Sequence, residues 1–345
     1  MKAAILGTTG YTGMVLSRIL ADHSEVTEVL PGSSSQAGEK LEVVDPGLGT
    51  ALSEKTRNTG GKLLSVEQIV REKPDVVFSA LPHLTSAEVC APFFGTSVVV
   101  DLSADFRIRD AGLFRKAYKE EPPRPELLEK AVYGLCEIYR SEIKRSDLIA
   151  NPGCYPTATL LPVLPLARAG AIRGRVLVNA LSGISGAGRK TSANYLYVER
   201  DENSGAYNPG STHRHHAEMA EQIHRADRAL DLLFTPHLVP LSRGMAATIA
   251  VELVKELDDA AIEKIYRDAY DGCPFVRITP GRIPQTKDVL ASNRCDLSWH
   301  REGGILMLFS VIDNLGKGAS GQAVQNMNIR FGFPETSGLR TYGEL

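Results

Sequence analysis

The first twenty residues restrict the fold more than any other part of the chain, because a short apolar segment, three evenly spaced glycines and a second apolar segment follow one another. Residues 2–6 are predicted to form a buried strand, residues 7–13 a loop and residues 14–20 a helix. Glycines at this position let the backbone approach a pyrophosphate closely, and the following helix presents its N-terminal N–H groups to it. The pattern predicts a dinucleotide-binding unit; a glycine-rich turn needed only for packing is the alternative. The predicted contacts are Gly7, Thr9, Gly10, Tyr11, Thr12 and Gly13.

The loop after the second predicted strand, residues 26–30, bears on the choice of dinucleotide. A fold specific for NAD usually places an Asp or Glu there for the ribose 2′-hydroxyl, and this chain has neither. Ser33, Ser34 and Ser35 stand in the loop instead, and their hydroxyls can donate hydrogen bonds to a 2′-phosphate. We therefore expect NADP in preference to NAD, a polar surface loop without a ligand being the alternative.

The first half of the chain alternates between predicted strands and helices. Residues 76–80 and 98–102 are continuous apolar runs, typical of parallel strands covered on both faces. Residues 65–72 and 86–94 are predicted to be helical. The alternation predicts an α/β fold with a Rossmann-type doubly wound parallel sheet over residues 1–150.

Longer strands follow, which indicate an α+β domain over residues 151–316 with a mixed or antiparallel sheet. They are predicted at residues 176–181, 245–253, 295–299 and 305–312. Apolar residues from Ile262 to Tyr270 recur at helical spacing and predict a core-facing helix. The C-terminal segment 317–345 contains a helix that Gly332 and Pro334 should stop, and we expect this segment to complete the first domain.

Composition limits the partners of the chain. Its 345 residues are 43% hydrophobic and carry a formal net charge of -2, so no basic face predicts nucleic acid and no polybasic run predicts a membrane. The N-terminal apolar run is too short for a signal peptide, and we expect a soluble cytoplasmic protein with small-molecule partners. The five cysteines are odd in number and widely spaced, which favours neither a disulfide framework nor a zinc site.

One of these cysteines, Cys154, stands where a turn is predicted to lead into a helix. The sequence Asn-Pro-Gly-Cys-Tyr-Pro-Thr at residues 151–157 supplies turn residues before the thiol and an apolar helix start after it. A helix N-terminus carries partial positive charge, which favours a thiolate. Cys154 is therefore the predicted nucleophile, and a buried structural cysteine is the alternative.

Three of the eight histidines fall within residues 213–216, which makes this segment the candidate source of a base. On a helix start, His215 and Glu218 would lie three residues apart, so the carboxylate could hold the imidazole in one tautomer. His213 and Glu218 are candidate substrate contacts. A metal site and a solvated polar turn are the alternatives.

Two polar loops follow predicted strands and suit an anionic substrate. Residues 182–190 combine glycines, hydroxyls and the cations Arg189 and Lys190, with Ser182 as a further candidate contact. Arg107 follows the strand at residues 98–102, where it could bind a phosphate through two parallel hydrogen bonds. A surface ion pair of Arg107 with Asp105 or Asp110 is the alternative.

Together these segments resemble the N-acetyl-gamma-glutamyl-phosphate reductases, the arginine-pathway branch of the aspartate-semialdehyde dehydrogenase-like family. The resemblance runs over nearly the whole chain, in eight segments that keep the same order. They are residues 7–13, 80–83, 102–107, 151–157, 182–189, 213–215, 234–240 and 313–321.

The resemblance implies NADPH-dependent reduction of an acyl phosphate to an aldehyde, with release of inorganic phosphate and a thioester on the enzyme. It implies that Cys154 is the nucleophile, His215 the acid/base and Arg107 a contact of the substrate phosphate. Leu81, Pro82 and Asn314 would contact the cofactor. A homodimer or homotetramer is also implied.

Some residues differ from the pattern of that family. It usually has an arginine within the segment that corresponds to residues 32–35, and often Thr-Pro where His216 and Ala217 stand here, so His216 competes with His215 for the acid/base role. The lysine-pathway relative typically has Ala-Gly-Cys-Asn around the nucleophile, so Pro-Gly-Cys-Tyr at residues 152–155 favours the arginine branch. Another acyl-phosphate reductase, or a dinucleotide-binding sensor without catalysis, remains an alternative.

Overall fold

The computed structural model describes residues 1–189 and 192–344. Its contacts divide the chain into two compact units. Unit 1 comprises Met1–Gly112, Glu120–Pro152 and Ala319–Leu339; unit 2 comprises Leu113–Lys119, Gly153–Gly318 and Arg340–Leu345.

Unit 1 contains a six-stranded sheet in the order β2-β1-β3-β4-β6-β5, and every pairing in it is parallel. Its strands are β1 (Lys2–Leu6), β2 (Glu28–Gly32), β3 (Val76–Ser79), β4 (Val98–Asp101), β5 (Val132–Tyr133) and β6 (Leu148–Ala150). All residues of β3 and β4 are buried, as expected for strands covered on both faces. The predicted doubly wound α/β sheet is confirmed, and ligands of such sheets bind beyond the carboxyl ends of the strands.

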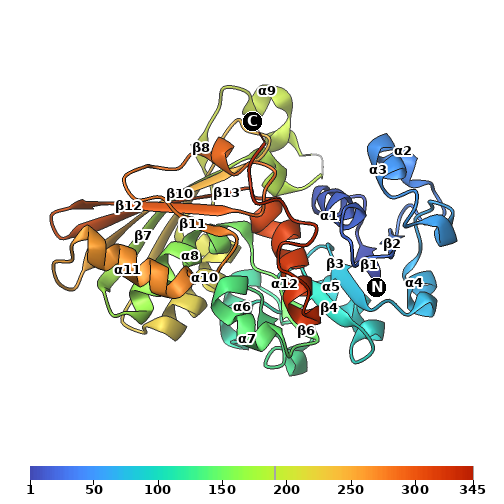
Figure 1. The fold of residues 1–345 in the computed structure, drawn as a ribbon, viewed down its shortest axis with the longest axis horizontal. Coiled ribbons are helices and arrows are strands. Elements are labelled where there is room, and N and C mark those ends of the chain that lie inside the picture. Colours follow the sequence, from blue (N-terminus) through green and yellow to red (C-terminus); the bar gives the residue numbers. More distant parts are fainter. Residues whose placement is uncertain (190–191, 345) are drawn as a thin grey trace. The chain divides into compact units, whose positions relative to one another are not determined.

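The helices of unit 1 lie beside this sheet (Figure 1). They are α1 (Tyr11–Ala21), α2 (Leu41–Val44), α3 (Pro46–Ala51), α4 (Val66–Glu72), α5 (Ser86–Val89), α7 (Cys136–Ile143) and α12 (Gly321–Phe331), with the short helices η1 (Arg57–Thr59), η2 (Ala91–Phe93) and η3 (Pro125–Leu127). Helix α6 (Ala111–Tyr118) contains residues of both units.

Two boundaries near the N-terminus differ from the prediction. Helix α1 begins at Tyr11, three residues earlier than expected, because Gly10 is its extended N-cap and the rest of the glycine loop is already helical. Strand β2 ends at Gly32 rather than at residue 30. It lies at the edge of the sheet, where Pro31 can stand in a strand without leaving a central hydrogen bond unmade.

Helix α12 belongs to unit 1 although it lies near the end of the sequence. The Ser320 hydroxyl at its start donates to the Thr12 carbonyl at 2.8 Å. The helix ends at Phe331, followed by Gly332 in the left-handed conformation, so the stop expected at Gly332 is found. Residues Arg340–Leu345 group with unit 2, so the expected C-terminal segment 317–345 does not stay in one unit.

Unit 2 contains a seven-stranded sheet in the order β11-β12-β13-β10-β7-β9-β8. Its strands are β7 (Ile172–Ser182), β8 (Gly205–Ala206), β9 (Asp231–Leu238), β10 (Met245–Leu253), β11 (Val276–Ile278), β12 (Cys295–Glu302) and β13 (Ile305–Ile312). The β7–β9 and β11–β12 pairs are parallel and the others antiparallel, so of the two predicted alternatives, a mixed or an antiparallel sheet, the mixed sheet is found. Strands β8, β9 and β11 are additions to the predicted strands.

Three long helices cover one face of this sheet (Figure 1). They are α8 (Cys154–Arg168), α10 (Arg214–Ala226) and α11 (Asp259–Tyr270). The shorter helices of unit 2 are α9 (Tyr197–Arg200), η4 (Ile184–Ala187), η5 (Ala193–Tyr195), η6 (Gly210–Thr212) and η7 (Thr286–Asp288). The π-helical turn η8 (Gly316–Ser320) contains residues of both units. Pro165 inside α8 cannot donate to the Leu161 carbonyl; the Tyr270 hydroxyl of α11 donates to that carbonyl instead. Two helices are thereby fixed to one another beneath the sheet.

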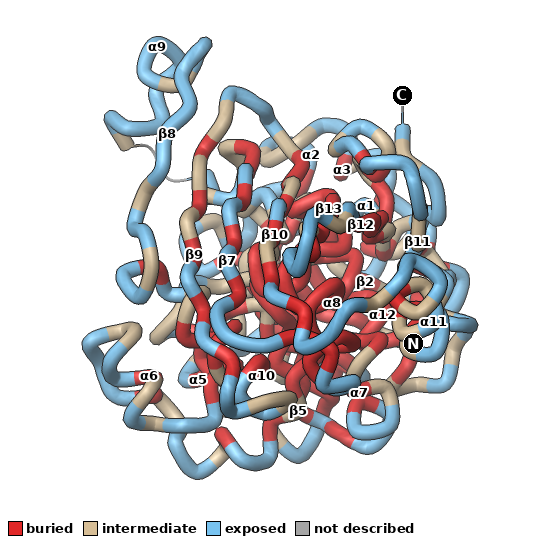
Figure 2. The backbone as a smooth tube through the Cα atoms, turned by 90° about the vertical axis from the view of Figure 1, so that its left-hand side faces the viewer, coloured by how far each residue is buried: buried red, intermediate tan, exposed pale blue. Residues whose placement is uncertain are grey.

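The other face of the sheet is open along its central strands, which alternate between buried and exposed residues (Figure 2). Leu177 and Leu181 of β7 are 40% and 44% exposed, and Leu233 of β9 is 47% exposed. Leu177 pairs with Leu233, so these leucines share one surface. We call this surface the open sheet face.

Candidate active site

Cys154 is the first residue of α8, preceded by Gly153 in an extended conformation (φ -68, ψ 160). The helix thus begins at the cysteine itself, whereas the sequence indicated a start after it. Every residue from 155 to 167 is buried, whereas Cys154 is only half-buried. The first N–H groups of an α-helix have no acceptor within the helix and carry partial positive charge. Partial positive charge at such a position favours a thiolate, and half-burial leaves part of the Cys154 side chain exposed. The role of Cys154 as nucleophile stays a prediction.

Glu218 ties the helix start of Cys154 to helix α10. Its side chain is fully buried, and its Oε1 accepts a hydrogen bond from the backbone N–H of Gly153 at 2.9 Å. Glu218 lies three residues after His215 on α10, so one carboxylate joins the helix of the predicted nucleophile to the helix of the predicted base. The expected contact of Glu218 with substrate, and its role in orienting His215, stay predictions.

The three neighbouring histidines have different surroundings. His213 is the N-cap of α10, and its Nδ1 accepts from the N–H of His215 at 3.1 Å, which requires the proton of the neutral ring to be on Nε2. Burial lowers the pKa of His213 to about 4, helped by Arg214 and His216. The Nε2 of His216 lies 3.2 Å from the Leu232 carbonyl, to which it can only donate. Two of the three rings therefore serve backbone groups.

Tyr155, the residue after the cysteine, packs against two of these histidines. Its ring centroid lies 5.5 Å from that of His213 and 6.0 Å from that of His215, both edge to face. Its hydroxyl donates to the His237 carbonyl and accepts from the Tyr207 hydroxyl, each at 3.2 Å. Burial raises the pKa of Tyr155 above its usual value and that of Tyr207 to about 12, so both phenols stay protonated near pH 7. The sequence prediction did not include this pair among the site residues.

The loops that follow β7 and β13 are joined by the side chain of Asn314. Its Oδ1 accepts from the Gly244 N–H at 2.7 Å and its Nδ2 donates to the Ser185 hydroxyl at 3.0 Å. The Ser182 hydroxyl, buried beside them, donates to the Gly183 carbonyl at 3.1 Å. Asn314 is thus a structural link within unit 2, and its predicted contact with a cofactor is untested.

Gly318 lies against Cys154, the predicted nucleophile. A Cβ atom added at Gly318 would be 2.8 Å from the Cβ of Cys154, closer than carbon atoms approach. Arg189 is exposed, and Lys190 of the same predicted loop lies outside the described residues. Gly318 was missed as a site residue, because its approach to Cys154 joins positions far apart in the sequence.

In unit 1 the glycine loop and two neighbouring loops come together. Gly7 has φ +90, and a Cβ there would lie 2.7 Å from the Ala80 carbonyl oxygen and 3.4 Å from Leu81 Cδ2. A Cβ at Gly13 would lie 2.2 Å from the Gly7 carbonyl oxygen. The N–H groups of Gly7 and Thr8 donate to the Gly32 carbonyl. These contacts join the glycine loop to predicted cofactor residues that follow β2 and β3.

The three predicted serines after β2 differ in exposure. Ser33 is buried, and its hydroxyl accepts from the Gln36 N–H at 3.3 Å. Ser34 and Ser35 are exposed. Two serine hydroxyls in this loop therefore face solvent, where a ligand could reach them.

Arg107 is 8% exposed and lies within unit 1. Its Nε donates to the Asn151 carbonyl at 2.8 Å, and a terminal nitrogen donates to the Leu102 carbonyl at 2.7 Å. These bonds fix the end of β4 to the residues that lead into Gly153. The predicted contact of Arg107 with a substrate phosphate stays untested.

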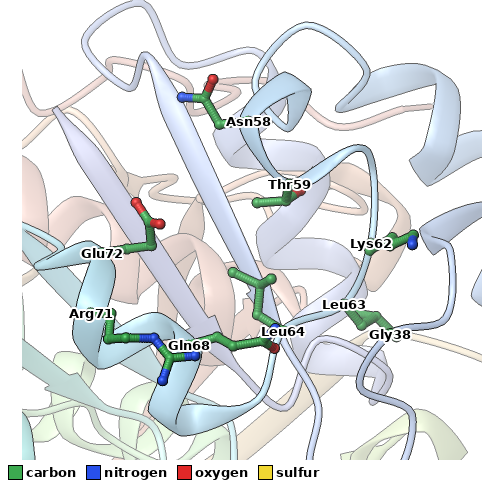
Figure 3. A pocket seen from close by; sticks show the side chains of 9 residues that line it. All are labelled: Gly38, Asn58, Thr59, Lys62, Leu63, Leu64, Gln68, Arg71 and Glu72. Carbon is green, nitrogen blue, oxygen red and sulfur yellow. The ribbon is translucent and has the colours of Figure 1, made fainter.

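A surface pocket of about 330 Å³ lies elsewhere in unit 1 (Figure 3). It is lined by Gly38, Asn58, Thr59, Lys62, Leu63, Leu64, Gln68, Arg71 and Glu72, none of which is a predicted site residue. Within the described residues, no group of three or more His, Cys, Asp or Glu side chains is arranged to hold a metal ion. Nor does any helix among them have the length and apolar character needed to cross a membrane.

Two family models match this chain, one over the region of the parallel sheet and the other over the region of the mixed sheet. Residues 2–146 match the NAD binding domain of semialdehyde dehydrogenases, and residues 154–314 match the semialdehyde dehydrogenase dimerisation domain. A nicotinamide dinucleotide site and an oligomer-forming domain are thus features of the family to which these models belong.

Curated relatives match over nearly the full length. The chain is 41% identical over 351 residues to an N-acetyl-gamma-glutamyl-phosphate reductase of Symbiobacterium thermophilum, covering 100% of this chain and 99% of the relative. It is 44% identical over 346 residues to the enzyme of that name from Desulforudis audaxviator, covering 98% of each.

Solved structures share the fold at lower identity. Aspartate semialdehyde dehydrogenase II of Vibrio cholerae, in complex with ASA, superposes with a TM-score of 0.72 at 17% identity, covering 95% of this chain and 97% of that one. The NADP complex of aspartate semialdehyde dehydrogenase from Candida albicans gives a TM-score of 0.65 at 16% identity, with the same coverage.

Proposed function

Because this chain belongs to the N-acetyl-gamma-glutamyl-phosphate reductase family, we propose that it reduces N-acetyl-L-glutamyl 5-phosphate to N-acetyl-L-glutamate 5-semialdehyde, with release of phosphate, as a step of arginine biosynthesis. The observation that carries this proposal is the half-buried thiol of Cys154 at the start of α8. The backbone N–H of Gly153, the residue before Cys154, donates to the carboxylate of Glu218, and Glu218 lies on the same helix as His215. A thiol and an imidazole on helices joined in this way suit acyl transfer through a covalent intermediate.

The proposed cofactor is NADPH. Gly7 and Gly13 leave no space for a side chain, as a loop that must admit a pyrophosphate requires. When bound, the cofactor supplies a hydride to the acyl carbon. The residues proposed to hold it are Gly7, Thr9, Gly10, Tyr11, Thr12, Gly13, Ser33, Ser34, Ser35, Leu81, Pro82 and Asn314. The serines can donate to a 2′-phosphate, but no arginine stands beside them, so we expect only a modest preference for NADP over NAD.

In the first half-reaction, the thiolate of Cys154 attacks the acyl phosphate. Its sulfur forms a bond to the acyl carbon while the bond between that carbon and the phosphate oxygen breaks, and phosphate leaves with the electron pair. The N–H groups at the start of α8 would stabilise the negative charge that develops on the carbonyl oxygen. Arg107, Ser182, Arg189, His213 and Glu218 are the proposed substrate contacts.

In the second half-reaction, the acyl carbon would gain a hydrogen as hydride from the bound cofactor, and the carbon–sulfur bond then breaks with its electron pair staying on the Cys154 sulfur, which releases the aldehyde. We assign the proton supplied to the departing thiolate to His215. His213 cannot readily carry it, because burial holds the pKa of that ring near 4. His216 is a weaker candidate, because its Nε2 is bonded to a backbone carbonyl.

We further propose that the open sheet face is buried in a homodimer, two of which could form a tetramer. Leu177, Leu181 and Leu233 expose apolar surface there, which a soluble protein usually covers by association. The strands that carry them lie within the region that matches the dimerisation domain of the family.

The reaction in the direction of acyl phosphate formation provides the test. Purified protein should reduce NADP⁺ with N-acetylglutamate semialdehyde only when phosphate is present, and aspartate semialdehyde should give at most a small fraction of that rate. Equal or higher rates with aspartate semialdehyde would assign the chain to another branch of the family. Binding of NADPH without any phosphate-dependent turnover would favour a sensor.

A further inference from the structure

The loop between β3 and α5, residues 80–85, is held from two sides within unit 1. On one side its first residues approach the glycine loop, since a Cβ added at Gly7 would contact the Ala80 carbonyl and Leu81 Cδ2. The Ala80 N–H also donates to the Leu6 carbonyl at 2.8 Å. Leu81 and Pro82 are proposed cofactor contacts, so the shape of this loop decides whether they can reach a dinucleotide.

On the other side, the loop is held by the carboxylate of Asp105. Its Oδ1 accepts from the Leu84 N–H at 2.6 Å, and its Oδ2 accepts from the Ala87 N–H at 3.0 Å. Leu84 has φ +65, a left-handed conformation that a leucine adopts only when its surroundings enforce it. A charge-assisted hydrogen bond to its N–H is such a constraint. Both oxygens of Asp105 thus fix backbone groups at the two ends of one short turn.

A second buried carboxylate supports the first. Asp101, at the end of β4, accepts from the Ser86 hydroxyl at 2.6 Å and from the Ser103 hydroxyl at 2.7 Å. The Ser103 oxygen in turn accepts from the Asp105 N–H at 3.1 Å. Both Asp101 and Asp105 are 0% exposed. Their network therefore joins the end of β4 to the loop after β3 and to the first turn of α5.

Two buried carboxylates side by side are an unusual way to close a turn. Burial, together with the charge of Asp105, raises the pKa of Asp101 to about 6. Burial also raises the pKa of Asp105 above its usual value. The charge of Arg107 acts in the opposite direction, because it favours the ionised carboxylate. Burying two carboxylates costs desolvation free energy, which their hydrogen bonds offset only in part. The pair holds the loop that carries Leu81 and Pro82, which points to a role in function.

We propose that Asp105, supported by Asp101 through Ser103, is a positioning residue for the dinucleotide: it holds Leu84 in its left-handed conformation and so keeps Leu81 and Pro82 against the glycine loop. The inference rests on the proposed function, since it assumes that unit 1 binds a nicotinamide dinucleotide. It assigns no contact between Asp105 and the cofactor.

The test is the affinity for NADPH, measured by titration calorimetry in the absence of acyl substrate. Asp105→Asn keeps the shape of the side chain but turns an NH₂ group towards one of the two backbone donors. We expect its Kd for NADPH to rise about tenfold, while kcat and the KM for the acyl substrate at saturating NADPH change less than about threefold. The matched control is Asp268→Asn, an exposed carboxylate of α11 in unit 2, whose Kd for NADPH should be that of the wild type.

Amide hydrogen exchange keeps the inference testable if Asp105→Asn fails to fold. In the wild-type protein without cofactor, the amides of Leu84 and Ala87 should be protected as strongly as those of β3; rapid exchange at these two amides would overturn the proposal. An unchanged Kd for the folded variant would also overturn it while leaving the proposed function intact. Wild-type protein that binds neither NADPH nor NADH would instead refute the proposed function.

Discussion

The ring of His213 is held neutral, which makes the stability of the protein depend on pH. Burial lowers its pKa to about 4, whereas the unfolded chain has a histidine pKa of about 6.5. Between about pH 6.5 and pH 4 the unfolded state therefore binds a proton that the folded state does not. The resulting stability is complete above pH 6.5, falls as the pH drops towards 4, and changes no further below that.

We expect this residue alone to remove about 2 kcal/mol from the free energy of unfolding between pH 7.5 and pH 5. His213→Asn retains a side chain suited to the N-cap of α10 but cannot titrate. Urea denaturation at the two pH values should give a smaller loss for the variant than for the wild type. Equal losses would show that His213 titrates normally in the folded protein.

The environments of His215 and His216 predict different consequences for turnover. His215→Asn should lower kcat at least ~100-fold, because the departing thiolate loses its proton donor. His216→Asn should cost less than ~10-fold, since the amide can still donate to the Leu232 carbonyl. Steady-state kinetics at saturating substrate compare the two, and a larger loss for His216→Asn would reverse the assignment.

For individual residues, the sequence indicates which side chains could carry the chemistry, but it does not indicate which of them contact one another. Cys154 could be located because turn residues and a helix start surround it locally. The contacts of Glu218 with Gly153 and of Tyr155 with His213 and His215 join positions about sixty residues apart. No local spacing reveals such contacts, so the partners of the predicted site residues had to come from the structure.

Among the elements, most of the longer strands were predictable, whereas β9 and the short strands β5, β6, β8 and β11 were not. Strands β10 and β13 have the predicted bounds, because apolar residues persist along their full length. Strand β9 was missed because it contains Pro236, which cannot donate to a neighbouring strand. It is tolerated here because its outer neighbour, β8, has only two residues.

The turn η8 allows a test of how closely the elements of the site are packed. A methyl group at Gly318 would lie 2.8 Å from the Cβ of Cys154 and 3.2 Å from Ile312 Cδ1, so either η8 or the start of α8 must shift. Because a misplaced nucleophile loses rate steeply, Gly318→Ala should lower kcat roughly 100-fold. The Kd for NADPH should not change.

Gly304→Ala is the matched control, since a Cβ at that glycine would have nothing within 4 Å. Its kcat should lie within about twofold of the wild type. If Gly318→Ala is as active as this control, the nucleophile tolerates displacement and the close approach has no functional meaning.

For the whole molecule, the open sheet face predicts how subunits associate. Leu233→Asp would place a charge in the centre of the proposed interface, which should convert dimers into monomers at micromolar concentration. Light scattering after size-exclusion chromatography gives the mass. Val43→Asp, at a residue of unit 1 that is 67% exposed, should leave the mass unchanged. A dimeric Leu233→Asp protein would place the interface elsewhere.

Sequence alone could separate a region with a parallel sheet from one with a mixed sheet, because the two differ in strand length and apolar pattern. It did not assign the short segments correctly. Leu113–Lys119 and Arg340–Leu345 belong to unit 2 although each adjoins residues of unit 1 in the sequence. Membership of such segments depends on contacts with distant residues, which no local pattern encodes.

The return of α12 to unit 1 has a consequence for how the chain matures on the ribosome. The first 152 residues contain every strand of the parallel sheet, yet Ala319–Leu339 is part of the same unit. A nascent chain must therefore emerge almost completely before this helix can occupy its place beside Thr12. Until then, the surface of unit 1 that α12 will cover stays exposed. Binding of a chaperone to this unit should therefore matter most late in translation.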